Sequence, residues 1–120
     1  MNYITFDIET YSPSDLDRID VNEFRVSVAG AYLSWTNEYV AFMEDDIKIL
    51  IDLMSEADMI IGYIHVGFDL PVMQKYADFD LMQLPNYDIM LALQEKLGFR
   101  LRLIDVCKAN LTEDIRTDRY

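Results

Sequence analysis

Two carboxylates near the N-terminus are spaced so that they could bind a divalent metal ion. Asp7 and Glu9 lie two residues apart in the run FDIET. If this run is a strand, both side chains point to the same face, roughly 6–7 Å apart along the strand. Mg²⁺ binds to proteins through one or two carboxylates together with water and substrate phosphates. The pair therefore predicts a metal platform, although an acidic pair on a solvated sheet face would show the same pattern.

A third carboxylate, Asp69, lies in the run IIGYIHVGFDLPVM. This run begins as an apolar strand, continues through a short loop and brings Phe68 and Asp69 to the start of an expected helix. Acidic residues also stabilise helix N-termini through the helix dipole, so Asp69 has a structural interpretation as well. The two roles are compatible, and Asp69 becomes the third candidate ligand.

In this order the two runs resemble the first and second motifs of the DEDD-type 3′–5′ exonucleases, which have a ribonuclease H-like fold. They are most similar to the branch that includes the exonuclease domain of family B polymerases and the YprB group. In that branch a Gly-Tyr/Phe-Asn run precedes Phe-Asp-Leu-Pro. The resemblance extends from Met1 to about Leu111. It implies an α/β fold, Mg²⁺ or Mn²⁺ as cofactor, and hydrolysis of phosphodiester bonds by a two-metal mechanism.

Under this resemblance the catalytic metal ligands are Asp7, Glu9 and Asp69. The implied substrate is the 3′ end of single-stranded DNA or RNA. The candidate substrate contacts are Thr10, Tyr11, His65 and Phe68. His65 is the single histidine of the chain and is expected in a loop beside the site, where it could position water. A loop histidine with no special task is the simpler interpretation.

Three features depart from the family pattern. The third motif, a Tyr or His four positions before an Asp on a C-terminal helix, is missing. Near the end of the chain, Asp114 follows Asn110 and Asp118 follows Asp114 at that spacing. Ile64 stands where the family usually has Asn. The net charge is −12, with 10 basic against 22 acidic residues, whereas nucleic-acid binders usually carry a basic face. We therefore expect a C-terminally truncated domain that takes its missing carboxylate or basic surface from another domain or chain.

These departures leave two alternatives to an active exonuclease. The first is a catalytically inactive ribonuclease H-like module for binding or assembly, whose exposed apolar sheet surface would favour a homo-oligomer or a partner. The second is a metal-dependent phosphatase or related phosphoryl-transfer enzyme for a small substrate. Only the nuclease predicts metal-dependent release of nucleotides that Asp7→Asn abolishes.

Hydrophobic periodicity predicts the elements that would position these residues. Strands are expected over residues 2–9, 24–35, 38–43 and 58–62, and a loop over residues 10–23. Helices are expected from residue 44, over 68–76, from 86 to Gly98, and over 100–111. In the first of these helices, the residues at helical spacing that should face the core are Ile47, Leu50, Ile51 and Met54. Asp88 is interpreted as a helix N-cap rather than a ligand.

Composition limits the class of protein. The chain has 120 residues, of which 52% are hydrophobic, so we expect a single α/β domain over residues 1–120 with a mixed sheet flanked by helices. No apolar run reaches the ~20 residues that cross a bilayer, and no signal-peptide pattern is present. Cys107 is the one cysteine, which indicates a reducing, cytoplasmic setting.

Overall fold

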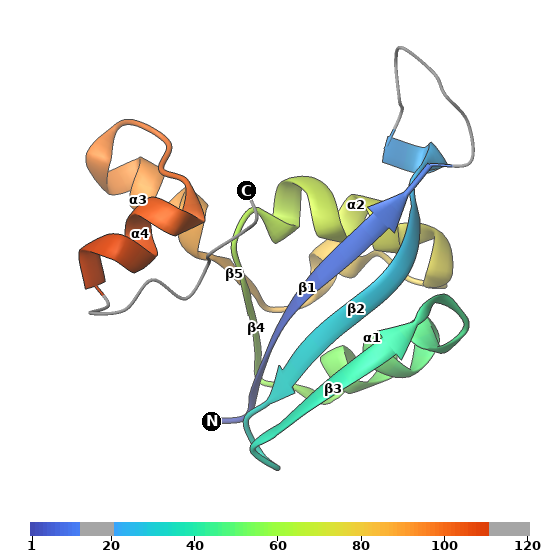
Figure 1. Cartoon of the computed structure of the whole chain (residues 1–120). Helices are drawn as coiled ribbons and strands as arrows, with labels where there is room; N and C mark the ends of the chain where they lie inside the picture. The colour runs from blue at the N-terminus through green and yellow to red at the C-terminus, as the bar shows by residue number, and fades with distance from the viewer. Residues whose placement is uncertain (13–20, 111–120) are drawn as a thin grey trace.

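A five-stranded mixed sheet forms the centre of the computed structural model, which describes residues 1–12 and 21–110 (Figure 1). Its strands are β1 (Tyr3–Tyr11), β2 (Arg25–Leu33), β3 (Glu38–Met43), β4 (Met59–Gly62) and β5 (Asn86–Asp88), in the order β3-β2-β1-β4-β5. The pairs β1–β2 and β2–β3 are antiparallel, whereas β1–β4 and β4–β5 are parallel. The predicted α/β class with a mixed sheet flanked by helices is confirmed.

Helices α1 and α2 pack on one face of this sheet, and α3 and α4 lie beyond its β5 side (Figure 1). The helices are α1 (Ile47–Glu56), α2 (Leu70–Met73), α3 (Ile89–Leu97) and α4 (Leu103–Asn110). A π-helical turn (His65–Asp69) leads into α2, and short 3-10 turns span Val21–Glu23, Glu44–Asp46, Gln74–Tyr76 and Leu81–Gln83. None of the helices in the described ranges is long and apolar enough to cross a membrane.

The core lies between the sheet and α1 and α2, and strand alternation decides which side chains enter it. Along β1, the even-numbered Ile4, Phe6 and Ile8 are buried, so Asp7 and Glu9 face the other side. The four core residues predicted in α1 are all buried, as their helical spacing requires. On the opposite face no helix covers β1 to β3 in the described part of the chain (Figure 1).

The ends of several elements differ from the sequence-based expectations. Residues 86–88 were expected to begin a helix but form strand β5, which pairs with β4. The helix expected over 68–76 begins earlier, in the π-helical turn at His65, and the last helix begins at Leu103. The N-cap prediction for Asp88 is confirmed, because its carboxylate accepts hydrogen bonds from the backbone N–H groups of Met90 and Leu91.

Candidate functional site

The candidate site lies where β1 continues past the end of its parallel neighbour. Strand β1 pairs with β4 only over Tyr3–Thr5, and it then runs on to Tyr11 while β4 ends at Gly62. This part of β1 is therefore flanked by the segment that follows β4 rather than by the strand itself. In α/β sheets, ligands bind at the carboxyl ends of parallel strands. The topology places such an edge beside Asp7.

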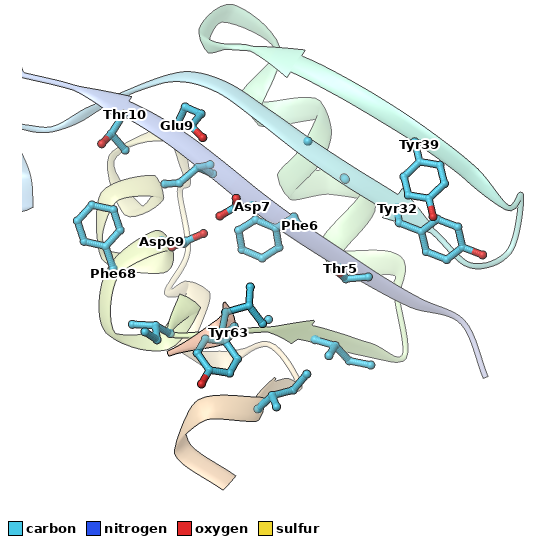
Figure 2. Close-up of a pocket in the computed structure, with 18 of the residues that line it drawn as sticks. Thr5, Phe6, Asp7, Glu9, Thr10, Tyr32, Tyr39, Tyr63, Phe68 and Asp69 are labelled. Carbon is cyan, nitrogen blue, oxygen red and sulfur yellow. The ribbon is translucent and has the colours of Figure 1, made fainter. Parts of the chain in front are cut away.

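Asp69 reaches this edge from the end of the π-helical turn, and its carboxyl group points toward Asp7 (Figure 2). Asp69 is buried and Asp7 is exposed. Burial raises the pKa of Asp69 to about 7, and the negative charge of Asp7 acts in the same direction. Hydrogen bonding from the backbone of Ile8 partly offsets this shift. Two segments far apart in sequence thus form one pair of carboxyl groups.

A groove of about 1010 Å³ opens in front of this pair. Of the seven predicted site residues, the groove is lined by Asp7, Glu9, Thr10, Phe68 and Asp69. The register of β1 against β2 shifts between Glu9 and Thr10, because Ser27 is an extra residue on β2. The extra residue lies on β2, so the alternation along β1 is kept. Thr10 lines the groove as the other even-numbered residues Phe6 and Ile8 do.

Tyr11 lies outside the lining of the groove. Its hydroxyl donates a hydrogen bond to Glu44 (3.0 Å), and the same carboxylate accepts from Arg25 (2.7 Å) and Tyr76 (2.5 Å). These hydrogen bonds lower the pKa of Glu44, and the hydrogen bond from Tyr76 has the largest effect. The residue expected to contact the nucleotide therefore joins a cluster that ties the end of β1 to β2 and to the turn after α2.

His65 also lies elsewhere than expected. It is fully buried rather than in an open loop, and its ring packs edge-on against Phe6, with ring centroids 5.9 Å apart. Its Nδ1 is 3.8 Å from Asp88 Oδ2, and neither ring nitrogen has a hydrogen-bond partner among the described residues. Burial lowers the pKa of His65, while Asp88 and the nearby Asn86 side chain act the other way. In this position His65 supports the turn that carries Asp69 and does not reach the groove.

Asp88 holds that turn in place. Its Oδ1 accepts from the backbone N–H of Ile64 (3.0 Å), and its Oδ2 accepts from that of Val66 (3.3 Å). The same carboxylate caps α3, so both oxygens of this buried side chain are engaged. Asp88 is therefore a positioning residue. An acidic N-cap directly before the apolar run IMLAL was the signal of it in the sequence.

The path of the chain between β4 and Asp69 depends on two backbone features. A Cβ atom on Gly62 would lie 2.5 Å from the Cγ and Nδ1 atoms of His65, so only glycine leaves room for the buried ring. Ile64 has φ 64°, in the left-handed region that β-branched residues rarely adopt. Asn and Gly tolerate this region best, so Ile64 holds a conformation that its branched side chain disfavours.

The far wall of the groove comes from the segment around the start of α4. The hydroxyl of Tyr63, at the end of β4, donates to the carbonyl oxygen of Leu101 and fixes this segment beside the sheet. Arg102 is the one basic side chain among the described residues that line the groove. Its Nε and Nη2 each lie 3.0 Å from a carboxylate oxygen of Asp105. A planar guanidinium held in this way suits recognition of oxyanions.

Asp7 and Asp69 are the side chains at the site that could hold a divalent ion. Within residues 1–12 and 21–110, no three His, Cys, Asp or Glu side chains come together as a group that could hold a metal ion. Asp7 and Asp69 nevertheless supply the one or two carboxylates from which proteins bind Mg²⁺ or Mn²⁺ when water and phosphates complete the shell. The two-metal site with Glu9 as a third ligand stays a prediction, and Asp114 and Asp118 lie outside the described residues.

Comparison with known proteins gives a partial likeness to solved structures. No protein-family model matches the chain, and no curated protein matches it. A solved structure of the family B DNA polymerase from the hyperthermophilic archaeon Pyrobaculum calidifontis is similar to it with 27% sequence identity and a TM-score of 0.49. The similarity covers 62% of this chain and 10% of that chain, so the chain spans about a tenth of the polymerase.

Proposed function

We propose that this domain hydrolyses phosphodiester bonds at the 3′ end of single-stranded nucleic acid with the help of Mg²⁺ or Mn²⁺. The observation that carries the proposal is the pair formed by buried Asp69 and Asp7 at the edge of a groove. Burial of Asp69 and the neighbouring charge of Asp7 disfavour its ionisation, as its raised pKa indicates. A bound cation removes this penalty, and perturbed carboxylates in clefts are frequent at functional sites.

The chain's own residues would hold the ion and orient the substrate. Asp7 and Asp69 would bind the ion, which supplies Lewis-acid polarisation of a phosphoryl oxygen. Asp7 is fixed by the sheet, and Asp69 by the turn that Asp88 fastens to α3. Such support from rigid elements keeps reacting groups within the narrow geometry that catalysis requires. Thr10 and Phe68 line the adjoining wall, where a terminal nucleotide would lie.

The test is release of nucleotides from a single-stranded oligonucleotide labelled at its 5′ end, with Mn²⁺ or Mg²⁺. Progressive shortening from the 3′ end is expected for the wild type. Loss of an outer-shell partner of a metal site lowers metal affinity or activity about 10- to 100-fold. Loss of a ligand in Asp7→Asn or Asp69→Asn should therefore lower the rate of nucleotide release at least about 100-fold. Asp52→Asn, on the exposed side of α1, removes the same charge and should leave the rate unchanged. Equal rates for wild type and Asp7→Asn would contradict the proposal.

The second candidate function is an inactive module for binding or assembly. It is favoured by the lack of a third metal-binding side chain beside Asp7 and Asp69 within the described residues. It predicts no turnover of oligonucleotides, of a generic phosphodiester or of a phosphomonoester, together with an oligomer in light scattering. Turnover of the monoester alone would instead favour the phosphatase. A monomer with measurable nuclease activity would contradict the inactive module.

A further inference from the structure

Two tyrosines on neighbouring strands form an aromatic platform on the open face of the sheet. Tyr32 on β2 and Tyr39 on β3 pair directly across the two strands. Their ring centroids are 4.9 Å apart and the rings are inclined by 49°. Tyr39 is 85% exposed, a large fraction for an aromatic side chain in a strand. We call these two residues the tyrosine platform.

The platform lies in the same groove as the carboxyl pair and close to it. Thr5 pairs with Tyr32, and two residues along β1 Asp7 pairs with Gly30, so Tyr32 and Asp7 share a face about 7 Å apart along the strand. Both tyrosines line the groove. Figure 2 shows Tyr32 and Tyr39 next to each other, with Thr5 near Tyr32.

The sheet surface beside Asp7 carries only very small residues. Asp7 pairs with Gly30 on β2, and Gly30 pairs with Ala41 on β3. Across the sheet from Asp7 there is therefore one residue without a side chain and one methyl group. An ideal Cβ on Gly30 would meet nothing within 4 Å, which shows open space above this row. The groove is thus shallow between the carboxyl pair and the tyrosine platform, and an extended chain of small cross-section could lie along it.

We propose that the tyrosine platform stacks a nucleobase of the single strand whose terminal phosphodiester lies at Asp7 and Asp69. The inference deepens the proposed function and rests on it. Tyr32 lies one strand and Tyr39 two strands away from β1, so with the offset along the strand the platform is about 8–12 Å from Asp7. At ~3.4 Å per nucleotide of a stacked strand, the stacked base is therefore expected two to four nucleotides from the bond that is cleaved. Stacking on aromatic rings accepts every base, so the platform gives affinity without sequence preference.

The charge of the chain favours this mode of binding over one based on phosphate contacts. The net charge is −12, and Arg102 is the one basic residue among the described residues that line the groove. Stacking needs no positive charge, and a divalent ion at the carboxyl pair would attract the phosphate. A second copy of the chain is the competing occupant, because β3 is an edge strand. Repulsion between two strongly acidic copies opposes that alternative.

The test measures the affinity of a fluorescent ten-nucleotide single strand by anisotropy, with Ca²⁺ as the ion. Tyr39→Ala should weaken binding by between about 5-fold and 150-fold, whereas Tyr39→Phe keeps the ring and should bind like the wild type. Tyr87→Ala is the matched control, because Tyr87 is an exposed strand tyrosine (47%) outside the groove. In a series of oligonucleotides that each lack one base, the one whose abasic site falls at the stacked position near the 3′ end should bind more weakly than the others. In Tyr39→Ala all members of the series should bind equally.

The outcomes separate this inference from the proposed function. Binding by the wild type that Tyr39→Ala leaves unchanged would overturn the platform, whether or not the protein cleaves its substrate. Tyr39-dependent binding without any cleavage would support the platform and contradict the hydrolytic proposal. A wild-type dimer that Tyr39→Ala converts to a monomer would also overturn the inference and identify a second copy as the occupant. Neither binding nor cleavage in the wild type would overturn both.

Discussion

The chemistry of the site depends on one buried carboxyl group. Sequence reasoning identified Asp7, Glu9 and Asp69 as candidates, because strand alternation fixes the face of the first two and the Phe-Asp run marks the third. It could not predict that Asp69 would be buried beside Asp7. That placement depends on the left-handed backbone at Ile64 and on the buried His65, neither of which has a periodic signal in sequence.

The first prediction concerns stability and pH. Because the pKa of Asp69 rises from 3.8 to about 7, the folded protein holds a proton between about pH 4 and 7 that the unfolded chain has lost. This group therefore makes the free energy of unfolding fall with rising pH in that window, by on the order of 4 kcal/mol, and adds no slope above it. In metal-free buffer, Asp69→Asn should be more stable than the wild type at pH 8, and this difference should shrink toward pH 4.

Urea unfolding at several pH values measures this difference. His65, whose pKa is lowered by burial, contributes a slope of opposite sign near its ordinary pKa, and the comparison between wild type and Asp69→Asn cancels it. The control Asp52→Asn should keep the wild-type profile. A gain in stability for Asp69→Asn that is the same at pH 5 and pH 8 would contradict the assigned pKa.

The second prediction tests the backbone at Ile64. At φ 64° a Cβ costs roughly 1–2 kcal/mol, whereas glycine adopts this conformation freely. Ile64→Gly should therefore be more stable than Ile64→Ala by about 1 kcal/mol in urea unfolding. At a position with ordinary helix or strand backbone the order is reversed, because a glycine variant there has a lower free energy of unfolding than an alanine variant. An Ala variant more stable than the Gly variant would show that the residue is not left-handed.

At the scale of elements, periodicity predicted those with a long apolar pattern. Strands β1 to β4 and helix α1 follow the expected positions, since each buries one face against the core. Strand β5 was missed because its three residues are too few to show alternation. The π-helical turn was missed because an extra residue per turn leaves no distinctive pattern in sequence. These two missed elements are the ones that position Asp69.

The third prediction concerns the contact between the end of β4 and the π-helical turn. Gly62→Ala forces its new Cβ into the ring of His65, which is enclosed by the core. Overpacking of this kind typically costs about 1–3 kcal/mol, so thermal and urea unfolding should show a loss in this range. Gly30→Ala is the control, because a Cβ there meets nothing within 4 Å; glycine in a strand is less stable than alanine, so a gain of about 0.5–1 kcal/mol is expected. Equal effects of the two substitutions would contradict the close approach.

At the scale of the whole molecule, acidic charge and an open sheet face define how a substrate could bind. The class of fold followed from the order of apolar segments. The groove did not, because it needs residues from β1 to β4 and from the start of α4 together. Tyr39 and Arg102 were missed for the same reason: nothing local distinguishes a groove-lining side chain from any other exposed one.

The fourth prediction concerns salt. Each phosphate contact with a basic residue on a single strand contributes a slope of about −0.7 to the dependence of log affinity on log salt. With Arg102 as the basic residue of the groove in the described ranges, raising NaCl from 50 to 200 mM should weaken oligonucleotide binding only about threefold. Removal of the divalent ion should have a much larger effect. A thousandfold loss with salt alone would indicate a basic surface that this groove does not have.

Calorimetric titration with Mn²⁺ tests the central claim most directly, because it needs neither substrate nor turnover. The account predicts saturable binding by the wild type, loss of that binding in both Asp7→Asn and Asp69→Asn, and unchanged binding in Asp52→Asn. This result would place the two segments around one metal site. Absence of binding in the wild type, or binding that survives Asp7→Asn, would contradict a metal site built on this pair.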